Sequence, residues 1–330
     1  MATTARLAQL ERTGSPVDVL ELKTEEMLSP GPGEVLVAME AAPINPADLN
    51  YISGTYGVRP KLPATPGLEG CGRVIEAGPG VRLPIGTRVR LPEGTGTWRT
   101  HALVEADGCL VLPDKLPPDQ AAMIYVNPLT AWRMLHDFVP LQRGDWIVQN
   151  AANSGVGRCV IQLAKTLGLR TCNLVRRPEL IPDLLMLGAD RVELDGPELP
   201  RQWPDTWGEA PPRLALNAVG GDSALRLAGL LGPGGTLVTY GAMSRQALKI
   251  PNGFLIFNDL RVRGFWLTAW ARSAGRETVA GALKQIEPLA LSGNLQMPVA
   301  ATYPLEDLKQ AVAHAEQEAR GGKVLLRLNS

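Results

Sequence analysis

"VQNAANSGVGRCVIQLAKTLGLRTCNLVRR", residues 148–177, decides the fold of this 330-residue chain. Apolar residues of the kind found in buried strands lead into a turn of small residues, an amphipathic helical segment and a second apolar run. Gly155 and Gly157 stand where the helix is expected to begin, and glycine there allows backbone N–H groups to approach a pyrophosphate. The stretch therefore predicts a strand–helix–strand unit that binds a dinucleotide.

The turn in this stretch does not carry the complete Gly-x-Gly-x-x-Gly pattern. Ala152 and Asn153 stand where further glycines would be. A pair of glycines is weak evidence by itself, and the alternative is a turn that binds nothing, but its place between a strand and a helix favours binding.

The end of the second strand indicates which cofactor is bound. An NAD enzyme places an Asp or Glu there for the ribose 2′-hydroxyl, whereas this chain continues "LVRRPE" with Arg176 and Arg177. Two guanidiniums match a 2′-phosphate in charge and in donor geometry. The sequence therefore predicts NADPH, and the alternative is that both arginines are ordinary solvated charges.

The pattern around this stretch predicts the fold class. Short apolar runs alternate with helical segments at 145–152, 171–176, 213–219 and 235–243, and each run ends in small or polar residues. Such alternation predicts an α/β fold with a doubly wound parallel sheet and right-handed crossovers. The first ~120 residues are rich in Pro and Gly, which indicates a separate β-rich domain.

Composition and charge exclude several classes of protein. The chain has 33 basic and 33 acidic residues, so no excess positive charge indicates a nucleic-acid or membrane partner. No apolar run approaches the ~20 residues of a transmembrane helix, and the N-terminus lacks the apolar core of a signal peptide. Cys71, Cys109, Cys159 and Cys172 are scattered, which indicates free thiols in a reducing compartment. We predict a cytoplasmic protein, with the mitochondrial matrix as the alternative for a processed form.

"YISGTYGVRP", residues 51–60, contains the most informative aromatic side chain of the β-rich part. Tyr56 lies between glycine-rich neighbours that keep the backbone open, so it is either a surface turn residue or a phenol at an active site. Composition alone favours the turn. Tyr51 follows "PADLN" on a short helical segment and is expected to pack in the core.

The order of these parts resembles the medium-chain dehydrogenase/reductase superfamily. The resemblance implies a GroES-like catalytic domain at 1–122 and 268–330 and a Rossmann domain at 123–267. Zinc enzymes of that superfamily need a Cys and a Gly-His-Glu motif, because zinc polarises the carbonyl. Here "PGLEGCG" has Leu68 in place of the histidine and "AAPINPADLN" has no cysteine, so no metal site is expected.

Among zinc-free members, the chain is similar to the 2-enoyl thioester reductases, including the mitochondrial trans-2-enoyl-CoA reductases. The motifs that carry this similarity include "PINPADLNYISGTYGVRPKLPATPGLEG", "VNPLTAWRML", "QNAANSGVG", "TYGAM" and "LRVRGFWL". The resemblance implies a homodimer that uses NADPH to reduce the 2,3 double bond of trans-2-enoyl thioesters of CoA or acyl carrier protein, in fatty acid metabolism. The alternatives are a zinc-independent NADPH:quinone oxidoreductase and a non-catalytic, crystallin-like nucleotide-binding protein.

The resemblance also assigns site residues. The tyrosine of the Gly-x-Tyr-Gly stretch is catalytic, which indicates Tyr56, and a phenol of pKa ~10 is able to donate a hydrogen bond to the thioester or a proton to Cα. Trp266 is expected beside the nicotinamide as a second catalytic residue. The cofactor contacts are expected from Asn127, Asn153, Ser154, Gly155, Val156, Gly157, Arg176, Arg177, Tyr240, Gly241, Ala242, Met243, Phe265, Trp266, Leu267 and Lys323.

Three of these residues have simpler interpretations when they are taken alone. Trp266 is then a core residue, Lys323 a solvated lysine and Asn127 a cap of the following helix. The family also often has an acidic residue between its two arginines, whereas here the arginines are adjacent. This departure leaves open which arginine contacts which part of the cofactor, but it does not change the predicted preference for NADPH.

Overall fold

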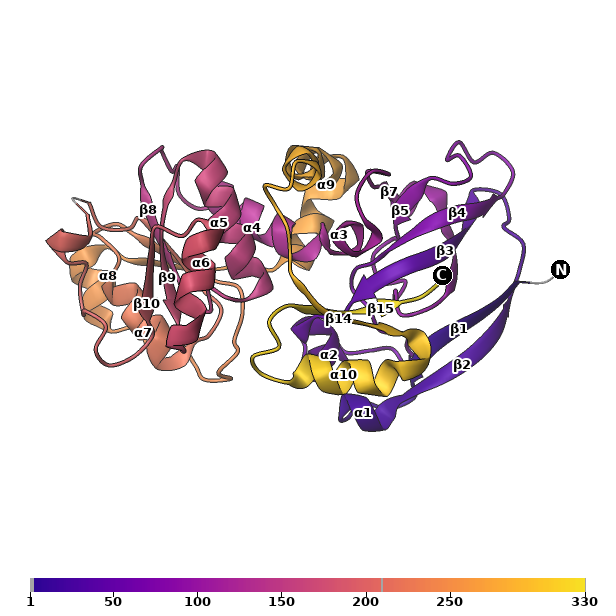
Figure 1. Cartoon of the computed structure of the whole chain (residues 1–330), viewed down its shortest axis with the longest axis horizontal. Helices are drawn as coiled ribbons and strands as arrows, with labels where there is room; N and C mark the ends of the chain where they lie inside the picture. The colour runs from indigo at the N-terminus through magenta and orange to yellow at the C-terminus, as the bar shows by residue number, and fades with distance from the viewer. Residues whose placement is uncertain (1–2, 209, 330) are drawn as a thin grey trace. The chain divides into compact units, whose positions relative to one another are not determined.

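The structure, a computed structural model, describes residues 3–208 and 210–329 (Figure 1). The described chain forms two compact units. The first unit runs to Val126 and resumes at Gln296, and the second spans Asn127–Leu295. No helix in these ranges combines the length and the apolarity that a bilayer span requires.

The elements of the first unit are β1 (Thr3–Leu10), α1 (Pro16–Val19), β2 (Leu20–Met27), β3 (Glu34–Pro43), α2 (Pro46–Ile52), β4 (Cys71–Ala77), β5 (Arg88–Arg90), β6 (His101–Glu105), η1 (Ala106–Gly108), β7 (Leu110–Val111), α3 (Pro118–Met123), β14 (Val299–Pro304), η4 (Leu305–Asp307), α10 (Leu308–Glu316) and β15 (Lys323–Arg327). The main sheet has the order β14-β15-β3-β4-β5-β7, with β6 paired to β3, and β1 and β2 form an antiparallel ribbon. Strands dominate this unit, as its Pro- and Gly-rich sequence predicts.

The core of the first unit explains why segments far apart in the sequence join it. Met39 of β3, Ile52 of α2, Trp98, Leu308 of α10 and Val324 of β15 are all fully or almost fully buried in one apolar cluster. β15 pairs antiparallel with β3, so the C-terminal segment adds a strand to the sheet that the N-terminal segment begins. Burial of these side chains holds α2 against the sheet.

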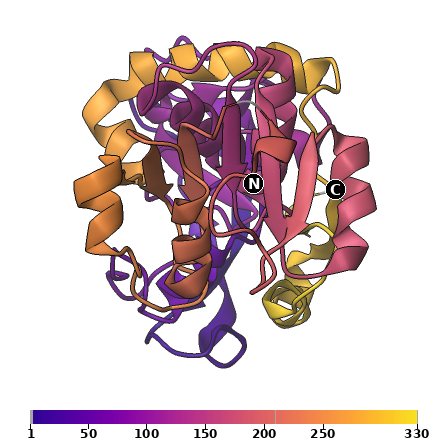
Figure 2. The same ribbon diagram turned by 90° about the vertical axis from the view of Figure 1, so that its left-hand side faces the viewer.

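The elements of the second unit are α4 (Val126–Asp137, whose first residue belongs to the first unit), β8 (Trp146–Gln149), α5 (Gly155–Leu167), β9 (Arg170–Val175), η2 (Pro178–Leu180), α6 (Ile181–Leu187), β10 (Arg191–Leu194), η3 (Asp205–Trp207), β11 (Leu214–Asn217), α7 (Gly221–Gly229), β12 (Thr236–Thr239), α8 (Asn252–Asn258), β13 (Arg261–Gly264) and α9 (Leu267–Leu291). The sheet has the order β10-β9-β8-β11-β12-β13 and all of its pairings are parallel. Figure 2 shows this unit facing the viewer, with helices on both sides of the sheet. The prediction of a doubly wound parallel sheet is confirmed.

The strand order places the ligand-binding edge of this sheet. The chain turns in opposite directions from β8, outward to β9 on one side and to β11 on the other. In such sheets, ligands bind outside the carboxyl ends of the strands at the point where the direction reverses. We therefore expect the residues that follow β8, β9, β11 and β12 to form the cofactor site.

The predicted domain boundaries differ from these units in one long segment. Residues 268–295 were expected to lie with the β-rich domain, but they group with the parallel sheet. The reason is that α9 begins directly after β13, and the guanidinium of Arg133 on α4 lies 4.8 Å from the ring centre of Trp270 on α9. The return to the first unit therefore comes about 30 residues later than the sequence pattern indicates.

Candidate cofactor and catalytic residues

The turn between β8 and α5 has the geometry expected of a dinucleotide loop. Ser154 is the N-cap of α5, and its hydroxyl oxygen accepts a hydrogen bond of 3.2 Å from the amide of Gly157. A Cβ atom built on Gly157 would lie only 2.5 Å from the carbonyl oxygen of Ala152. The glycine at 157 is therefore required because the helix approaches the turn so closely.

We expect the substitution Gly157→Ala to lower the free energy of unfolding by about 1–3 kcal/mol, because the added methyl group overpacks a backbone contact. The substitution is also expected to weaken NADPH binding, because relief of the clash moves the loop away from the N-terminus of α5. Urea unfolding and equilibrium titration with NADPH measure the two effects.

Gly281→Ala is the matched control for this substitution. Gly281 lies on α9 in the same unit, and a Cβ built there meets no atom within 4 Å. Alanine in an open helix position is favoured over glycine by about 1 kcal/mol. Equal losses of stability in the two variants would contradict the role assigned to the close approach at Gly157.

Beneath the loop lies a buried network of polar side chains that the sequence analysis did not identify. The side-chain amide of Asn150, directly after β8, donates to Oδ1 of Asn217 at the end of β11 over 2.8 Å and to the hydroxyl of Ser223 over 2.9 Å. The same Oδ1 accepts from the amide of Gly220 over 3.0 Å. These bonds tie the carboxyl ends of two neighbouring strands together and hold the cofactor edge of the sheet rigid.

The two predicted arginines lie at this same edge. β8 and β9 pair in parallel with Gln149 opposite Asn173, so Arg176 and Arg177 follow β9 on the side where α5 begins. Arg176 is exposed, and Nε of the half-buried Arg177 lies 3.5 Å from the carboxylate of Glu179. Both guanidiniums are therefore accessible beside the loop.

The remaining predicted cofactor residues of the second unit follow its other strands. The "YGAM" segment comes directly after β12, where the amide of Tyr240 donates to the carbonyl of Asn217 over 3.0 Å. Phe265, Trp266 and Leu267 follow β13. Trp266 is 39% exposed, so the alternative of a core tryptophan is wrong for this position. Asn127 is buried in the first turn of α4.

Tyr56 lies in the first unit, in the turn that follows α2. Its amide donates to the carbonyl of Asn50 over 3.1 Å, and the amide of Thr55 donates to the same oxygen over 2.9 Å. Gly54 has a φ of 74°, a left-handed conformation that glycine adopts most readily, and this turns the chain back onto the helix. Tyr51 packs against the apolar core, as predicted. The structure thus separates the two tyrosines: one packs on the core and the other is held at the end of a helix.

A buried cluster of charged groups lies at the other end of α2. Asp48 accepts from the amides of Asn45 (2.8 Å) and Leu68 (2.9 Å), and Glu69 accepts from the side-chain amide of Asn45 over 2.9 Å. Lys323, which the sequence analysis assigned to the cofactor or to solvent, is buried and donates from Nζ to Oδ1 of Asn45. The solvated alternative for Lys323 is therefore wrong.

Burial dominates the electrostatics of this cluster. It raises the pKa of the Asp48 carboxyl to about 7, although two backbone N–H groups and Lys323 oppose the shift. Burial also raises the pKa of Glu69, against the positive charges of Lys323 and Arg90 and the bond from the amide of Val126. Burial thus makes the loss of the proton less favourable at both carboxyl groups than it is in water.

Comparison with known proteins identifies the family. Residues 31–114 match the alcohol dehydrogenase GroES-like domain, and residues 155–287 match the domain described as zinc-binding dehydrogenase. The chain is 41% identical over 332 residues to the mitochondrial enoyl-[acyl-carrier-protein] reductase of Xenopus tropicalis, which covers 98% of this chain and 95% of that protein. The chain belongs to this enoyl reductase family.

Solved structures of this superfamily also resemble the enoyl reductase fold of the chain. The complex of Etr1p with NADP and crotonyl-CoA has a TM-score of 0.89 and 32% identity, and the match covers 98% of this chain and all of that one. A putative NADPH:quinone reductase from Bacillus thuringiensis has a TM-score of 0.90 and 31% identity, and the match covers 99% of this chain and all of that one. The prediction of a medium-chain dehydrogenase/reductase of the enoyl thioester reductase type is confirmed.

Within this enoyl reductase, the segments that carry zinc ligands in alcohol dehydrogenases are joined by hydrogen bonds. Asn45 and Asp48 of "AAPINPADLN" bond to Glu69 and to the amide of Leu68 in "PGLEGCG". Residues 3–208 and 210–329 contain no group of three or more His, Cys, Asp or Glu side chains that could hold a metal ion. In this chain the two segments are therefore connected directly, by carboxylate and amide groups.

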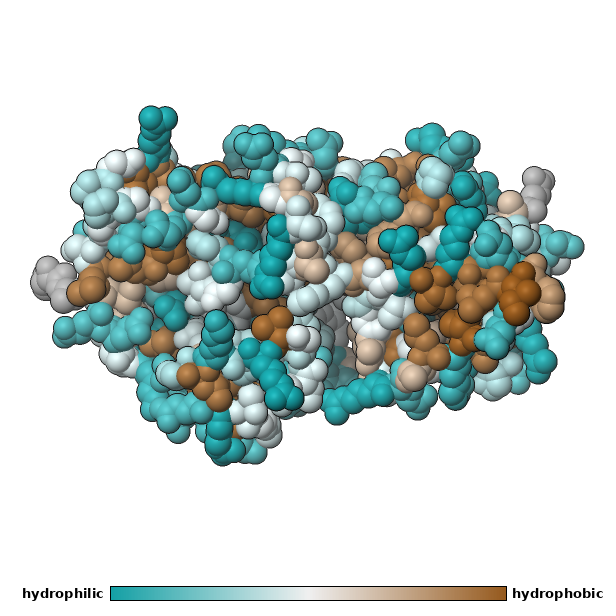
Figure 3. Space-filling view, turned by 180° about the vertical axis from the view of Figure 1, so that it is seen from behind, coloured by the Kyte–Doolittle hydropathy of each residue, from teal (hydrophilic) through white to brown (hydrophobic). Residues whose placement is uncertain are grey.

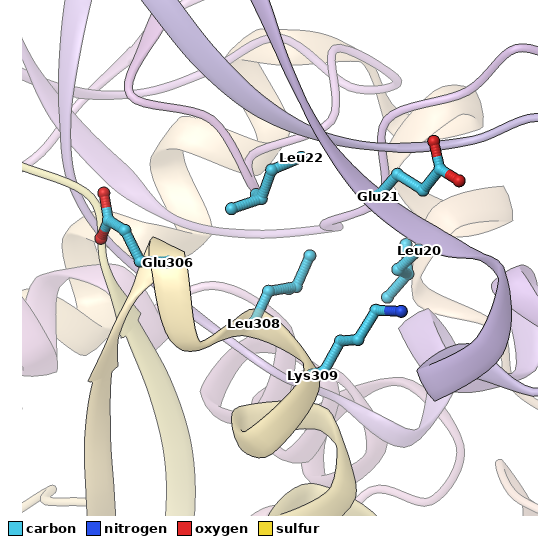
Figure 4. Close-up of a pocket in the computed structure, with 6 residues that line it drawn as sticks. All are labelled: Leu20, Glu21, Leu22, Glu306, Leu308 and Lys309. Atoms are coloured by element: carbon cyan, nitrogen blue, oxygen red, sulfur yellow. The ribbon is translucent and has the colours of Figure 1, made fainter.

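A hollow on the first unit lies apart from the predicted site residues. It is lined by Leu20, Glu21, Leu22, Glu306, Leu308 and Lys309, from β2, η4 and α10 (Figure 4). Glu306 forms an ion pair with Arg6, and Leu20 and Leu308 belong to the core. None of the residues predicted for the enoyl reductase site is among the six that line this hollow.

Proposed function

We propose that the chain catalyses the NADPH-dependent reduction of the 2,3 double bond of trans-2-enoyl thioesters. The observation that carries this proposal is the likeness, over nearly the whole chain, to the Etr1p complex with NADP and crotonyl-CoA. The relatives with the name enoyl-[acyl-carrier-protein] reductase support the same chemistry. CoA thioesters and thioesters of an acyl carrier protein are both proposed as substrates.

The residues of the second unit fit a phosphorylated dinucleotide. A loop packed closely against the N-terminus of α5 suits a pyrophosphate, and two accessible guanidiniums at the end of β9 suit a 2′-phosphate. We propose that Asn153 to Gly157 hold the pyrophosphate, that Arg176 and Arg177 hold the 2′-phosphate, and that the segments after β12 and β13 contact the nicotinamide half.

The reaction requires a hydride from the cofactor and two contributions from the protein. Bound NADPH supplies the hydride that adds to Cβ of the enoyl thioester. The chain must then stabilise the negative charge that develops on the thioester oxygen and must deliver a proton to Cα. We propose that Tyr56 donates a hydrogen bond to the thioester oxygen or a proton to Cα, because a phenol is protonated at neutral pH and donates without prior activation. Trp266 and the buried Asn127 are proposed to orient the nicotinamide and the substrate.

An NADPH-oxidation assay with enoyl-CoA thioesters of increasing chain length tests this function. We expect saturable turnover of crotonyl-CoA or trans-2-hexenoyl-CoA, with an absorbance loss at the nicotinamide band that matches the substrate consumed. The same enoyl group attached to an acyl carrier protein tests whether carrier-protein thioesters are substrates as well as CoA thioesters. Turnover no faster than the uncatalysed rate with all enoyl thioesters would contradict the proposal.

The second candidate function is that of an NADPH:quinone oxidoreductase. The putative quinone reductase from Bacillus thuringiensis favours it, because its fold and identity match as well as those of Etr1p. Rapid quinone reduction without turnover of enoyl thioesters would establish it. Binding of NADPH with no turnover of either class would instead indicate the crystallin-like alternative.

We propose that the chain forms a homodimer through one face of the second unit. β13 is an edge strand with all four residues exposed, and on α8 Leu255, Ile256 and Phe257 are 43%, 69% and 84% exposed. Figure 3 shows apolar side chains gathered towards its right-hand side, over this unit. An unpaired edge strand beside exposed apolar side chains suits a second copy of the same chain, related by a two-fold axis.

Sedimentation velocity tests the homodimer. Ile256→Glu combined with Phe257→Glu is expected to convert a dimer to a monomer, because each charge would be buried without a partner in the interface. Met186→Glu is the control, since Met186 on α6 is 81% exposed and lies outside this face. A wild-type chain that sediments as a monomer at micromolar concentration would contradict the proposal.

We propose that the protein acts in mitochondria. The curated relatives are named as mitochondrial enzymes, which favours the mitochondrial matrix. The cytoplasmic location predicted from the free cysteines has no support from these relatives.

A further inference from the structure

Glu69 is buried and forms two hydrogen bonds that lead in different directions. Oε2 accepts from the amide of Val126 over 2.7 Å, and Oε1 accepts from the side-chain amide of Asn45 over 2.9 Å. Its own carbonyl oxygen accepts from the hydroxyl of Thr97 over 2.7 Å. Side chain and backbone of Glu69 are thus both fastened inside the first unit, and the carboxylate is available to hold Asn45.

Asn45 begins α2 and transmits this anchor to the helix. It is the N-cap of α2, its own amide donates to Asp48 over 2.8 Å, and its Oδ1 accepts from the ammonium of Lys323. Charge-assisted bonds in a buried site are stronger than bonds between neutral groups and resist exchange with water. The first turn of α2 is therefore held by groups from two other segments of the chain, residues 68–69 and Lys323.

The other end of α2 holds Tyr56. The carbonyl of Asn50 accepts from the amides of Thr55 and Tyr56, and the amide of Ser53 donates to the carbonyl of Leu49 over 2.9 Å. α2 has only seven residues, and its position is set by the packing of Ile52 in the core and by the hydrogen bonds at its first turn. A shift of its N-terminus therefore moves the turn that carries Tyr56.

We propose that Glu69 is a positioning residue for Tyr56 and acts through Asn45 and α2. Reacting groups must be held to a fraction of an ångström, and a displacement of about 1 Å costs about 100-fold in rate. The segments "AAPINPADLN" and "PGLEGCG" lack the Cys and His of the zinc enzymes. We therefore assign the alignment of the Tyr56 phenol to the hydrogen bonds between these segments. This inference rests on the proposed function for its kinetic part and is independent of it for its structural part.

The substitution Glu69→Gln tests the proposal, because it keeps the shape of the side chain but replaces one acceptor oxygen with an NH₂ group. One of the two N–H donors, from Asn45 or from Val126, then faces another donor instead of an acceptor. We expect kcat for crotonyl-CoA to fall about 10- to 100-fold, while the Kd of NADPH changes less than about twofold. We also expect hydrogen exchange of the amides of Thr55 and Tyr56 to accelerate at least about tenfold, because the turn loses its fixed support. Asn45→Ser is the second variant, since serine retains the helix cap but loses the bond to Glu69.

Glu40→Gln is the matched control. Glu40 on β3, in the same unit, accepts from Nε of Arg73 over 3.0 Å and from Nε of Arg88 over 2.6 Å, and the thiol of Cys71 also donates to it. These partners lie outside α2. This control is expected to lose stability and to keep both kcat and the exchange of residues 53–57 within about twofold of the wild type. Equal changes in the Glu40 and Glu69 variants would overturn the proposal, because they would indicate general loosening.

A double variant separates positioning from other effects. If Glu69 acts through Tyr56, then Glu69→Gln lowers kcat much less in a Tyr56→Phe background than in the wild type. Fully additive losses would overturn the proposal, as would unchanged exchange of residues 53–57 in the Glu69→Gln chain. If the wild-type chain does not reduce enoyl thioesters, the proposed function fails, but the exchange measurement still decides whether Glu69 holds this turn.

Discussion

Tyr56→Phe is expected to lower kcat for crotonyl-CoA by about 100- to 1,000-fold. Removal of one hydrogen-bond donor to a developing oxyanion has an effect of that order, because the donor is aimed at charge that appears only in the transition state. NADPH affinity is expected to stay within about twofold of the wild type, since the residues proposed to hold the phosphates of the cofactor belong to the second unit. Stopped-flow measurement of NADPH oxidation and fluorescence titration of NADPH give the two quantities.

Tyr51→Phe is the matched control for this substitution. Both changes remove one phenolic hydroxyl from residues five positions apart, but Tyr51 packs against the apolar core. The control is therefore expected to keep kcat within about threefold. Wild-type turnover in the Tyr56→Phe chain would refute the catalytic role of that residue, whatever the control shows.

Replacement of both Arg176 and Arg177 by alanine is expected to raise the Kd of NADPH about 100-fold or more. Each charge-assisted hydrogen bond to a phosphate contributes about 1.5–3 kcal/mol, and both guanidiniums are accessible at the end of β9. The Kd of NADH is expected to change less than about threefold, because NADH has no 2′-phosphate. Isothermal titration of the wild type and the variant with NADPH and with NADH gives the change in Kd for each cofactor.

The control for the arginine pair is the double substitution of Arg170 and Arg213 by alanine. Arg170 begins β9 and Arg213 precedes β11, so both lie at the amino edge of the same parallel sheet. The change in net charge is identical, but the charges are removed at the edge of the sheet opposite to the strand ends that are proposed to bind the cofactor. An equal rise in the Kd of both cofactors in the Arg176 and Arg177 variant would show that the 2′-phosphate assignment is wrong.

Several features of the fold follow from local sequence because the physics behind them is local. The stretch 148–177 predicts β8, α5 and β9, since apolar runs and helical periodicity depend only on neighbouring residues. The packing of Tyr51 follows in the same way from its place on a short helix. The boundary at 268–295 was missed because α9, although it is kinked at Gly275, shows no sequence feature that marks which unit it joins. It follows directly on β13, and the contact of Arg133 with Trp270 links it to the second unit.

The sequence by itself determined the α/β class and the β8–α5–β9 unit, and it predicted the dinucleotide loop, the two arginines at the end of β9 and, through the family resemblance, Tyr56 rather than Tyr51 as the catalytic residue. Only the tertiary structure showed that Lys323 and Glu69 are buried together on Asn45, and that Asn150 and Asn217 join two strand ends. Those groups come from segments up to 278 residues apart, and no periodicity relates them. Whether a charged side chain is solvated or buried depends on what packs around it, and that information exists only once the chain has folded.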